Sequence, residues 1–455
     1  MRDHLNGFRN RRQNMPRGCR SAYSRWLAVW GVVCGLLSAV LPATAQEALR
    51  NMQAGDANAS SRTRQMQSSQ QDYTYRNGDF RLLVLPSLGL DWNDNINLSH
   101  NNPMDDYIVK PAVGVTASYP FTQQNLLYLN VSIGYDRYLN HPSLSTFDLN
   151  SSSGTGLSFD IGIKHVTLNL HDWLNYTQDA AQNGAVASTV NGAVVNTESY
   201  GTFQNTAGLS ATWDLNQVTL SAGYDHQNVL ATSGSFNNIN HASEMLFARA
   251  GFQVHPKILL GLESTASFTT YDQSGSNTSL NDNNAYTVGP YITLTPDAYF
   301  QMTARGGFST YQFQQTSAAI QTSSQDSWYA GLTVSHQPTD FMSYSLAVGR
   351  EVQLGIQSDL VQDWYVRPSI TWNFIRGFGF NTSFFYEHGT QGVGNVAGNF
   401  TESYDQYGGG LSLQHALTSR LSLAVNYRLT LRSSNIANNG YTQNLVGLQL
   451  TYHPQ

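Results

Sequence analysis

From Phe80 to Tyr452 the chain repeats one pattern, in which apolar side chains occupy every second position and small polar residues lie between them. In one segment the apolar set is Leu127, Leu129, Val131, Ile133 and Tyr135, and the polar set is Asn130, Ser132, Gly134 and Asp136. A period of two places each set on its own face of a strand, and helical spacing does not fit. The pattern therefore predicts an all-β fold.

About eighteen segments (16–18) follow this rule. They cover 80–93, 106–119, 125–138, 148–163, 165–177, 200–213, 217–228, 242–255, 257–271, 284–296, 298–312, 325–337, 341–354, 361–374, 377–389, 402–415, 419–432 and 441–452. Short connections such as Asp214–Asn216 alternate with long polar ones such as Gln178–Ser199. This alternation is typical of a closed antiparallel transmembrane β-barrel with short periplasmic turns and long extracellular loops.

A soluble all-β protein, such as a propeller, a β-helix or a string of sandwiches, would show the same alternation. Bulky aromatic residues favour the membrane barrel, because they gather near segment ends on the apolar face, as interfacial girdles do. Examples are Trp92, Trp213, Trp328, Trp364, Trp372 and Tyr452. A blade repeat of 40–50 residues, which a propeller would show, is not visible. We therefore expect residues 79–455 to form an outer-membrane barrel.

The N-terminal segment is typical of a secretory signal peptide. Arginines precede an apolar run from Trp26 to Leu41, and Pro42-Ala-Thr-Ala45 offers a cleavage site before Gln46. A membrane anchor is the alternative, but the run is short for a span. Translation from Met15 would give a more usual signal length. Residues 46–78 are polar and aperiodic, and we expect a flexible periplasmic lead-in.

Composition excludes several classes of protein. Charged residues make up only 12% of the chain and hydrophobic ones 40%, which fits neither an ordinary soluble enzyme nor a helical membrane protein. Residues 1–45 hold seven arginines and one aspartate, so their removal leaves a net charge of about −12, and nucleic-acid binding is excluded. Cys19 and Cys34 lie in the same segment, so the mature chain has no thiol chemistry.

Three segments resemble the β-barrel porin 2 family of outer-membrane proteins. They are Leu85–Ser99 (LPSLGLDWNDNINLS), Asp106–Val115 (DYIVKPAVGV) and Val166–Asp179 (VTLNLHDWLNYTQD). The resemblance implies an outer-membrane channel of mostly unknown cargo, with some relatives near exopolysaccharide export genes, and it implies no catalytic residues. The last strand, which closes on Tyr452, also resembles the signal read by the barrel assembly machinery, although His453-Pro-Gln455 extends beyond it.

Charged residues on the polar face are the candidate pore lining. They are Lys110, Arg249, Arg305, Arg367 and Arg428, together with Asp91, Asp136, Asp160, Asp225, Glu263 and Glu387. One hypothesis is that opposed rows of charge create a transverse field that orients polar solutes. The other is that the charges pair across neighbouring strands and stiffen the wall. The sequence does not separate the two.

Other chemistry finds little support. His165, His255, His336 and His415 lie beside short turns of different hairpins, which argues against a metal site. Asp94, Asn95, Asn97, Asp105 and Asp106 could supply oxygen ligands to Ca²⁺, but EF-hand spacing is missing and we expect solvated loop residues. His171, Asp172 and Asn175 have no nucleophile signature beside them. We expect no enzyme activity, no cofactor and no metal.

The sequence therefore predicts a porin-like channel in the Gram-negative outer membrane that passes small hydrophilic solutes by diffusion. Outer-membrane lipid and the barrel assembly machinery are the expected partners. The alternative is a barrel that serves exopolysaccharide export or surface attachment without porin activity. Its inner aromatic residues could stack on sugar rings, namely Tyr128, Trp173, Tyr329 and Tyr365. Gln178–Ser199, the longest loop, is the candidate for an inward-folded constriction.

Overall fold

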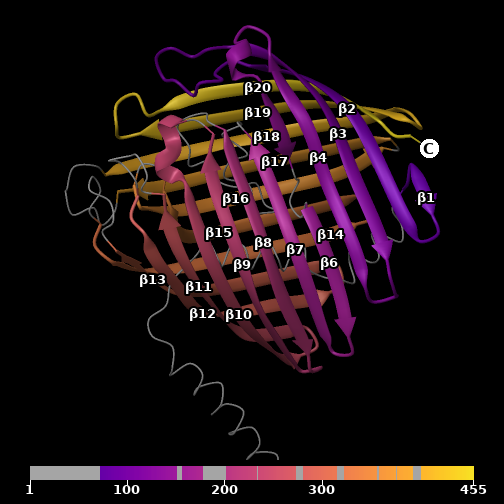
Figure 1. Ribbon diagram of the computed structural model, residues 1–455, viewed down its shortest axis with the longest axis vertical. Coiled ribbons are helices and arrows are strands. Elements are labelled where there is room, and N and C mark those ends of the chain that lie inside the picture. Colours follow the sequence, from indigo (N-terminus) through magenta and orange to yellow (C-terminus); the bar gives the residue numbers. More distant parts are fainter. Residues whose placement is uncertain are drawn as a thin grey trace, which may run out of the picture. The chain divides into compact units, whose positions relative to one another are not determined.

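One continuous antiparallel sheet of strands makes up nearly all of the described chain (Figure 1). The computed structural model describes residues 72–150, 156–177, 201–232, 234–272, 280–314, 322–355, 358–375, 377–392 and 401–454. All of them belong to the unit Ala43–Gln455. The predicted signal peptide, its cleavage site between Ala45 and Gln46, and most of the predicted lead-in lie outside the described residues.

The strands follow one another closely along the chain. They are β1 (Tyr75–Asn77), β2 (Phe80–Asn93), β3 (Asp106–Pro120), β4 (Leu126–Tyr138), β5 (Thr146–Asn150), β6 (Gly156–Ile163), β7 (Val166–Thr177), β8 (Thr202–Asp214), β9 (Val218–Ala231), β10 (His241–His255), β11 (Ile258–Tyr271), β12 (Asn283–Asp297), β13 (Phe300–Phe313), β14 (Gln325–Thr339), β15 (Met342–Leu354), β16 (Leu360–Ile375), β17 (Phe378–Gln391), β18 (Glu402–Thr418), β19 (Leu421–Ser434) and β20 (Tyr441–Tyr452). Two short 3-10 helices, η1 (Pro142–Leu144) and η2 (Gly234–Ile239), lie in connections.

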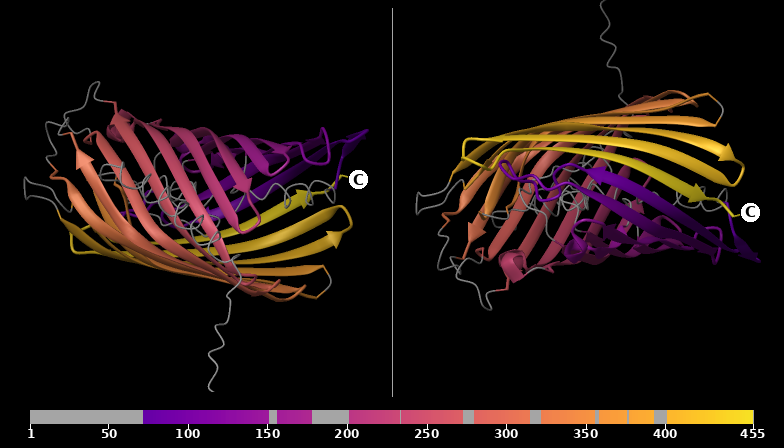
Figure 2. Two further views of the ribbon diagram at one scale, coloured as in Figure 1. Left: turned by 90° about the horizontal axis from the view of Figure 1, so that it is seen from below. Right: turned by 90° about the horizontal axis from the view of Figure 1, so that it is seen from above.

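The sheet closes on itself. From β2 onward each strand pairs antiparallel with the next one, except that β5 and β6 do not pair with each other, and β20 returns to β2 over the register from Ser87↔Thr451 to Asn93↔Leu445. In Figure 2 the indigo and yellow ends of the sheet lie side by side. Strands β5 and β6 share one position between β4 and β7. The described strands therefore form a closed barrel with eighteen wall positions, which confirms the predicted fold class.

The two faces of the sheet are the reverse of those in a soluble protein. Outward side chains are apolar and exposed, as in Leu88 (53% exposed) and Phe308 (74%). Inward side chains are polar or charged and buried, as in Glu263 (1%) and Glu387 (0%). A soluble barrel would bury its apolar face, because that burial drives folding in water. This arrangement suits an apolar surrounding medium and a polar interior.

The connections differ in length between the two ends. At one end, called here the turn end, strands join through tight turns in which Lys164 (φ 55°) and Asn216 (φ 70°) adopt left-handed backbone. The other end, called the loop end, carries the longer connections, including η1 and η2. This alternation was predicted from the sequence. No helix in the described ranges is long and apolar enough to cross a bilayer.

Two expectations were wrong in part. The predicted strand 148–163 is two strands, β5 and β6, on either side of residues 151–155, which lie outside the described ones. The lead-in 46–78 was expected to be flexible throughout, yet its last residues form β1, which pairs with Phe80–Leu82 after a turn at Gly78 (φ 60°). Three residues are too few to show a period, so the sequence pattern did not reveal β1.

Candidate pore lining

Asp91 on β2 and Asp225 on β9 lie on the inner face of the wall, and so do the other nine candidate pore-lining residues. They are Lys110 on β3, Asp136 on β4, Asp160 on β6, Arg249 on β10, Glu263 on β11, Arg305 on β13, Arg367 on β16, Glu387 on β17 and Arg428 on β19. The four acids among these nine residues and Arg367 are buried, whereas Lys110, Arg249, Arg305 and Arg428 are half-buried. Strand parity was thus a sufficient signal for their orientation.

The first charged group on the wall is centred on Lys110. Its ammonium lies 3.3 Å from a carboxylate oxygen of Asp91 and 3.3 Å from one of Asp136. The three residues come from the neighbouring strands β2, β3 and β4. One cation therefore pairs with two acids.

A denser group surrounds Arg367. Its Nη2 lies 3.0 Å from Oε1 of Glu387, 3.9 Å from Glu351 and 4.0 Å from Asp363. Its Nε donates a hydrogen bond of 3.1 Å to Glu387. The guanidinium also lies over the ring of Tyr365, 4.2 Å from the centroid, which adds a cation–π contact. The guanidinium thus holds three acids together on β15, β16 and β17.

Two further groups repeat this combination of arginine, acid and tyrosine. On β11–β14, Arg305 lies 3.5 Å from Glu263, and the Tyr329 hydroxyl donates to Glu263 at 3.3 Å. Near the loop end, Arg432 lies 3.1 Å from Glu402 and 3.8 Å over the ring of Tyr404. Arg249 similarly covers Tyr291, at 3.9 Å.

Sequence reasoning missed four of these residues, namely Glu351, Asp363, Glu402 and Arg432. Asp363 lies four positions before Arg367 on β16, and Arg432 lies four positions after Arg428 on β19, so both share the parity of a predicted residue. Glu351 and Glu402 lie on β15 and β18, where no residue was predicted. They sit toward the loop end of their strands, where polar residues also suit an exposed loop. Parity followed to the last residue of each strand would have found them.

The ion pairs run along the wall. Every inner pair just described joins strands that are adjacent or two positions apart, except Arg367–Asp363, which lies within β16. This geometry matches the hypothesis of cross-strand pairing, in which a buried charge is compensated by a neighbour. It gives no direct support to opposed rows of unpaired charge.

Inner tyrosines lie flat against the wall because glycines on preceding strands leave room for them. A Cβ added at Gly289 or Gly307 would contact Tyr329 at 2.6 and 2.8 Å, and one added at Gly349 would contact Tyr365 at 2.6 Å. Real Cβ atoms do not approach other atoms so closely, so the ring positions require glycine here. Tyr329 and Tyr365 therefore use one face for the wall, and Arg367 covers the other face of Tyr365.

At the loop end, the tip of the β15–β16 hairpin is tied to distant connections. The Asp359 carboxylate accepts hydrogen bonds of 2.8 Å from the Asn281 amide nitrogen and from its side chain, and another from the Thr322 hydroxyl. The Tyr311 hydroxyl donates to the Val352 carbonyl at 3.1 Å. Burial raises the pKa of the Asp359 carboxyl, against the lowering effect of these hydrogen bonds.

An apolar cluster includes Tyr311 and Val352, the two residues joined by the hydrogen bond just described. It consists of Met245, Ala285, Tyr311, Val352 and Leu360, with Phe313 and Leu354 packed against it. The cluster thus joins residues of β10, β12, β13, β15 and β16. The loop predicted to constrict the path, Gln178–Ser199, lies outside the described residues, so that prediction stays open.

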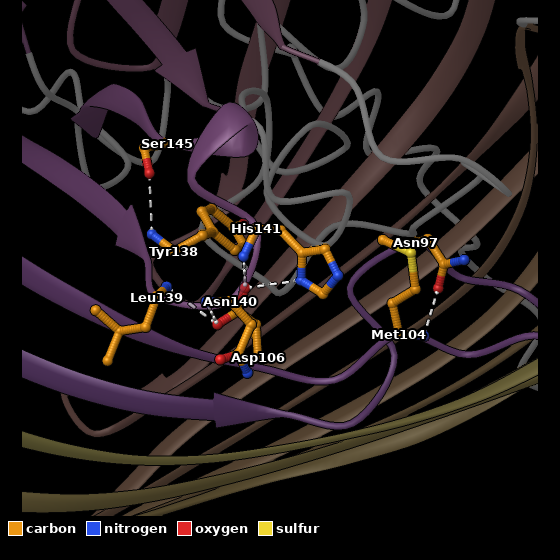
Figure 3. A network of polar contacts seen from close by, with 8 residues as sticks. All are labelled: Asn97, Met104, Asp106, Tyr138, Leu139, Asn140, His141 and Ser145. Atoms are coloured by element: carbon orange, nitrogen blue, oxygen red, sulfur yellow. Dashed lines mark hydrogen bonds and ion pairs between the residues drawn. The ribbon is translucent and has the colours of Figure 1, made fainter.

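Asp106 begins β3, directly after the connection 94–105, and it binds the connection 139–145 that follows β4. Its carboxylate accepts hydrogen bonds from the backbone nitrogens of Leu139 (3.1 Å), Asn140 (2.9 Å) and His141 (2.8 Å), and pairs with His141 Nδ1 at 2.9 Å (Figure 3). Asn97 Oδ1 accepts the Met104 nitrogen at 2.9 Å. Asp106 and Asn95 are buried. The expectation that these residues are all solvated was wrong, because they hydrogen-bond the backbone of folded loops.

The turn-end histidines serve local contacts. His336 hydrogen-bonds the Tyr344 hydroxyl at 2.6 Å, and His415 stacks on Phe378 and bonds the Gly377 carbonyl at 3.0 Å. Within the described ranges, no three His, Cys, Asp or Glu side chains come together as metal ligands would. The groups assembled on the wall are ion pairs and hydrogen bonds.

The fold and its lining define a closed antiparallel β-barrel with a charged, polar interior. No family model matches the chain, and no curated protein matches it. Among solved structures, it is similar to OccK2 (OpdF) of Pseudomonas aeruginosa in complex with glucuronate, at 12% identity and a TM-score of 0.45 over 82% of this chain and 98% of that chain. It is similar to a BenF-like porin from Pseudomonas fluorescens Pf-5, at 11% identity and a TM-score of 0.45 over 83% and 99%.

The outer membrane protein opdK from Pseudomonas aeruginosa is a third such structure, at 12% identity and a TM-score of 0.43 over 81% of this chain and 98% of that chain. Membership of the β-barrel porin 2 family stays a prediction.

Proposed function

We propose that the protein is a porin-like channel of the Gram-negative outer membrane, through which small hydrophilic solutes diffuse passively. The observation that carries this proposal is the inverted wall, with exposed apolar side chains outside and buried charged side chains inside. A closed barrel of about 18 strands is wide enough to enclose water rather than a side-chain core. Lipid is the medium that suits the outer face, and water is the medium that suits the inner one.

The lining supports a path for polar solutes. Because its charged side chains are paired, it should show little preference for solutes of one charge over the other. Arg305, Arg367 and Lys110 each contact an acid within 3.5 Å, so the field along the wall is made of local ion pairs. Selectivity would then depend on the pore radius and on the groups that carry excess charge.

Planar bilayer recording with the purified mature protein tests the channel. Stepwise conductance increments are expected on insertion. A barrel that stays silent at every voltage, also after its long loops are shortened, contradicts the proposal. Membrane fractionation of cells that produce the full chain should place the protein with outer-membrane markers, and recovery in the inner-membrane or periplasmic fraction would contradict the location.

The alternative, a barrel for exopolysaccharide export or attachment, needs open aromatic faces for sugar rings. Tyr329 lies against wall glycines and is buried, and Tyr365 is covered by Arg367. Two of the four aromatic positions expected for sugar stacking are thus occupied by the protein itself. This observation favours the channel.

A further inference from the structure

A group of three polar side chains lies on the outer face of β9 and β10. The Tyr224 hydroxyl donates a hydrogen bond to the Glu244 carboxylate, and His226 Nδ1 lies 2.9 Å from the other oxygen of that carboxylate. His226 and Glu244 are register partners, and Tyr224 precedes His226 by two positions, on the same face of β9. Leu246, two positions after Glu244, is exposed. The group therefore belongs to the face that carries the exposed apolar side chains.

This polar surface extends to β8 and β7. The Asn228 amide donates to His226 Nε2 at 2.9 Å, and Asn205 on β8 lies directly opposite Asn228. Asn205 Nδ2 in turn donates to Asp172 Oδ1 at 2.5 Å. Two amides and a second carboxylate thus continue the group along the outer face.

The same arrangement occurs again on β17 and β18. The Tyr386 hydroxyl donates to Asp405 Oδ1 at 2.8 Å, and His388 Nδ1 lies 3.0 Å from that oxygen. His388 and Asp405 are register partners, and Tyr386 again precedes the histidine by two positions. Tyr407, two positions after Asp405, is exposed. Each group is therefore a Tyr-x-His segment that faces a carboxylate on the next strand.

The two groups occupy matching positions near the loop end. Glu244 is the fourth residue of β10 and Asp405 is the fourth residue of β18. Toward the turn end, the outer face of β18 continues with exposed apolar side chains, such as Leu411 and Leu413. A carboxylate is costly within hydrocarbon. The groups therefore mark the level at which lipid headgroups begin on the loop side of the membrane.

The two groups lie on nearly opposite sides of the barrel. β17 comes eight strands after β9 in a ring of eighteen wall positions. A protein neighbour seated on one side does not reach the other side, whereas lipid surrounds the whole barrel. The repeated arrangement therefore fits a lipid better than a single protein partner.

The exposed atoms of the groups suit hydroxyl ligands. Asp405 uses Oδ1 for both of its hydrogen bonds, so its Oδ2 and His388 Nε2 hold no partner among the described residues. The histidines and acids of both groups are 38% to 48% exposed. A carboxylate accepts a hydrogen bond from a hydroxyl, and an imidazole nitrogen either donates to a hydroxyl or accepts from it. Recognition of hydroxyls is therefore possible in either protonation state of the histidines, whereas a bare phosphate would be repelled by the carboxylates.

We propose that the two groups bind the sugar headgroups of glycolipids in the outer leaflet of the outer membrane. The proposal goes beyond the channel function and rests only on the proposed location. Asp405 and His388 contact headgroup hydroxyls on one side of the barrel, and Glu244 does so on the other. Tyr224 and Tyr386 lie at the boundary with the hydrocarbon, where aromatic rings with a polar tip are favoured. The barrel thus holds one glycolipid on each side.

Native mass spectrometry of the purified mature protein tests this binding without any need for conduction. The probes are lipid A, which has a phosphorylated diglucosamine headgroup, its dephosphorylated form, and phosphatidic acid, which has a phosphate but no sugar. The wild type should retain one molecule of either glycolipid at each group. It should bind phosphatidic acid about tenfold or more weakly, because several hydrogen bonds are missing. Equal binding of phosphatidic acid would overturn the proposal.

Substitutions in each group test the two positions separately. His388→Leu combined with Asp405→Leu should weaken the binding of one glycolipid about tenfold or more, and His226→Leu combined with Glu244→Leu should do the same for the other. Because these side chains are exposed on the outer face, leucine should leave the barrel folded, which gel migration before and after boiling checks. Retention of both glycolipids by the variant with all four substitutions would contradict the proposal.

His336→Leu is the matched control. His336 lies on the outer face at the turn end and contacts the Tyr344 hydroxyl at 2.6 Å, so it faces the other leaflet, and the variant should bind both glycolipids like the wild type. A dimer in the spectra that the loop-end substitutions dissociate would assign these faces to a second copy of the chain and overturn the proposal. A protein that binds glycolipid but never conducts contradicts the channel function alone, so the two failures are distinguishable.

Discussion

Arg367 shows how a single side chain stabilises the inner wall. Its guanidinium contacts Glu387 at 3.0 Å and lies within 4.0 Å of Glu351 and Asp363, and all four side chains are buried or nearly so. Removing the cation would leave three acids close together with little water around them. Breaking a buried ion pair on one side is costly because the remaining charge loses its compensation.

Arg367→Met should therefore lower the free energy of unfolding by roughly 3 kcal/mol, measured by guanidinium titration of tryptophan fluorescence in detergent. Arg420→Met is the control, because Arg420 is exposed in the turn between β18 and β19, and it should change stability by less than about 0.5 kcal/mol. Equal effects of the two substitutions would show that the Arg367 pairs contribute nothing specific.

At the scale of elements, the loops are held by side chains that reach across connections. Asp106 and Asp105 are adjacent in sequence but differ completely in environment, since Asp106 is buried and accepts four hydrogen bonds from residues 139–141, whereas Asp105 is exposed. The pair therefore offers a direct comparison of a structural and a solvated carboxylate.

Asp106→Ala should release the turn between β4 and β5, because the backbone nitrogens of Leu139, Asn140 and His141 lose an acceptor. Hydrogen–deuterium exchange of the Asn140 and His141 amides should accelerate by about tenfold or more, which corresponds to a loss of at least about 1.4 kcal/mol of local stability. The Leu139 amide should respond less, because it also donates to the Tyr107 carbonyl at 3.0 Å. Asp105→Ala should leave them unchanged. Slow exchange in both variants would mean that other contacts hold this turn.

The hydrogen bonds of the Asp359 carboxylate join the β15–β16 hairpin to Asn281, which precedes β12, and to Thr322, which precedes β14. Asp359→Ala removes the acceptor for Asn281 and Thr322, so we expect the hairpin tip to loosen from the loop end. Limited proteolysis in detergent should cleave the tip faster, and single-channel currents should become noisier. Asp340→Ala, in the turn between β14 and β15 at the turn end, is the control. Unchanged cleavage would show that the apolar cluster alone holds the hairpin.

Sequence alternation predicted the strands well because the period is a local property. β2 and β20 begin and end at the expected residues, 80–93 and 441–452. Parity also oriented the charged side chains correctly. It did not predict which of them meet, because the stagger between strands decides that Arg305 reaches Glu263 across β12. The contact of His171 with Asp225 further depends on the missing side chain of Gly208.

At the scale of the whole molecule, a single seam closes the ring. β20 and β2 come from opposite ends of the barrel sequence and pair over seven register partners, against thirteen for β2 and β3. The seam has fewer pairs than that neighbouring interface. The mature chain is expected to contain no cysteine, so introduced cysteines can report on this closure specifically.

Leu90→Cys combined with Leu448→Cys should form a disulfide under mild oxidation, because the two residues are register partners on the outer face. The cross-linked barrel should migrate differently from the reduced one after boiling. Leu88→Cys with Val446→Cys, four positions out of register, should not cross-link. Cross-linking of the second pair but not the first would disprove the seam as described.

β1 affects how the barrel edge can pair with other copies of the protein. β20 covers the β2 edge only from Ser87 onward, while β1 pairs with Phe80–Leu82 on that same side, and Thr74 Oγ1 accepts the Val84 nitrogen at 3.0 Å. Without this short strand, the part of β2 before Ser87 would present unpaired peptide groups on this edge. Another copy of the protein could pair with them by adding a strand. By pairing with this edge, β1 opposes edge-to-edge polymerisation.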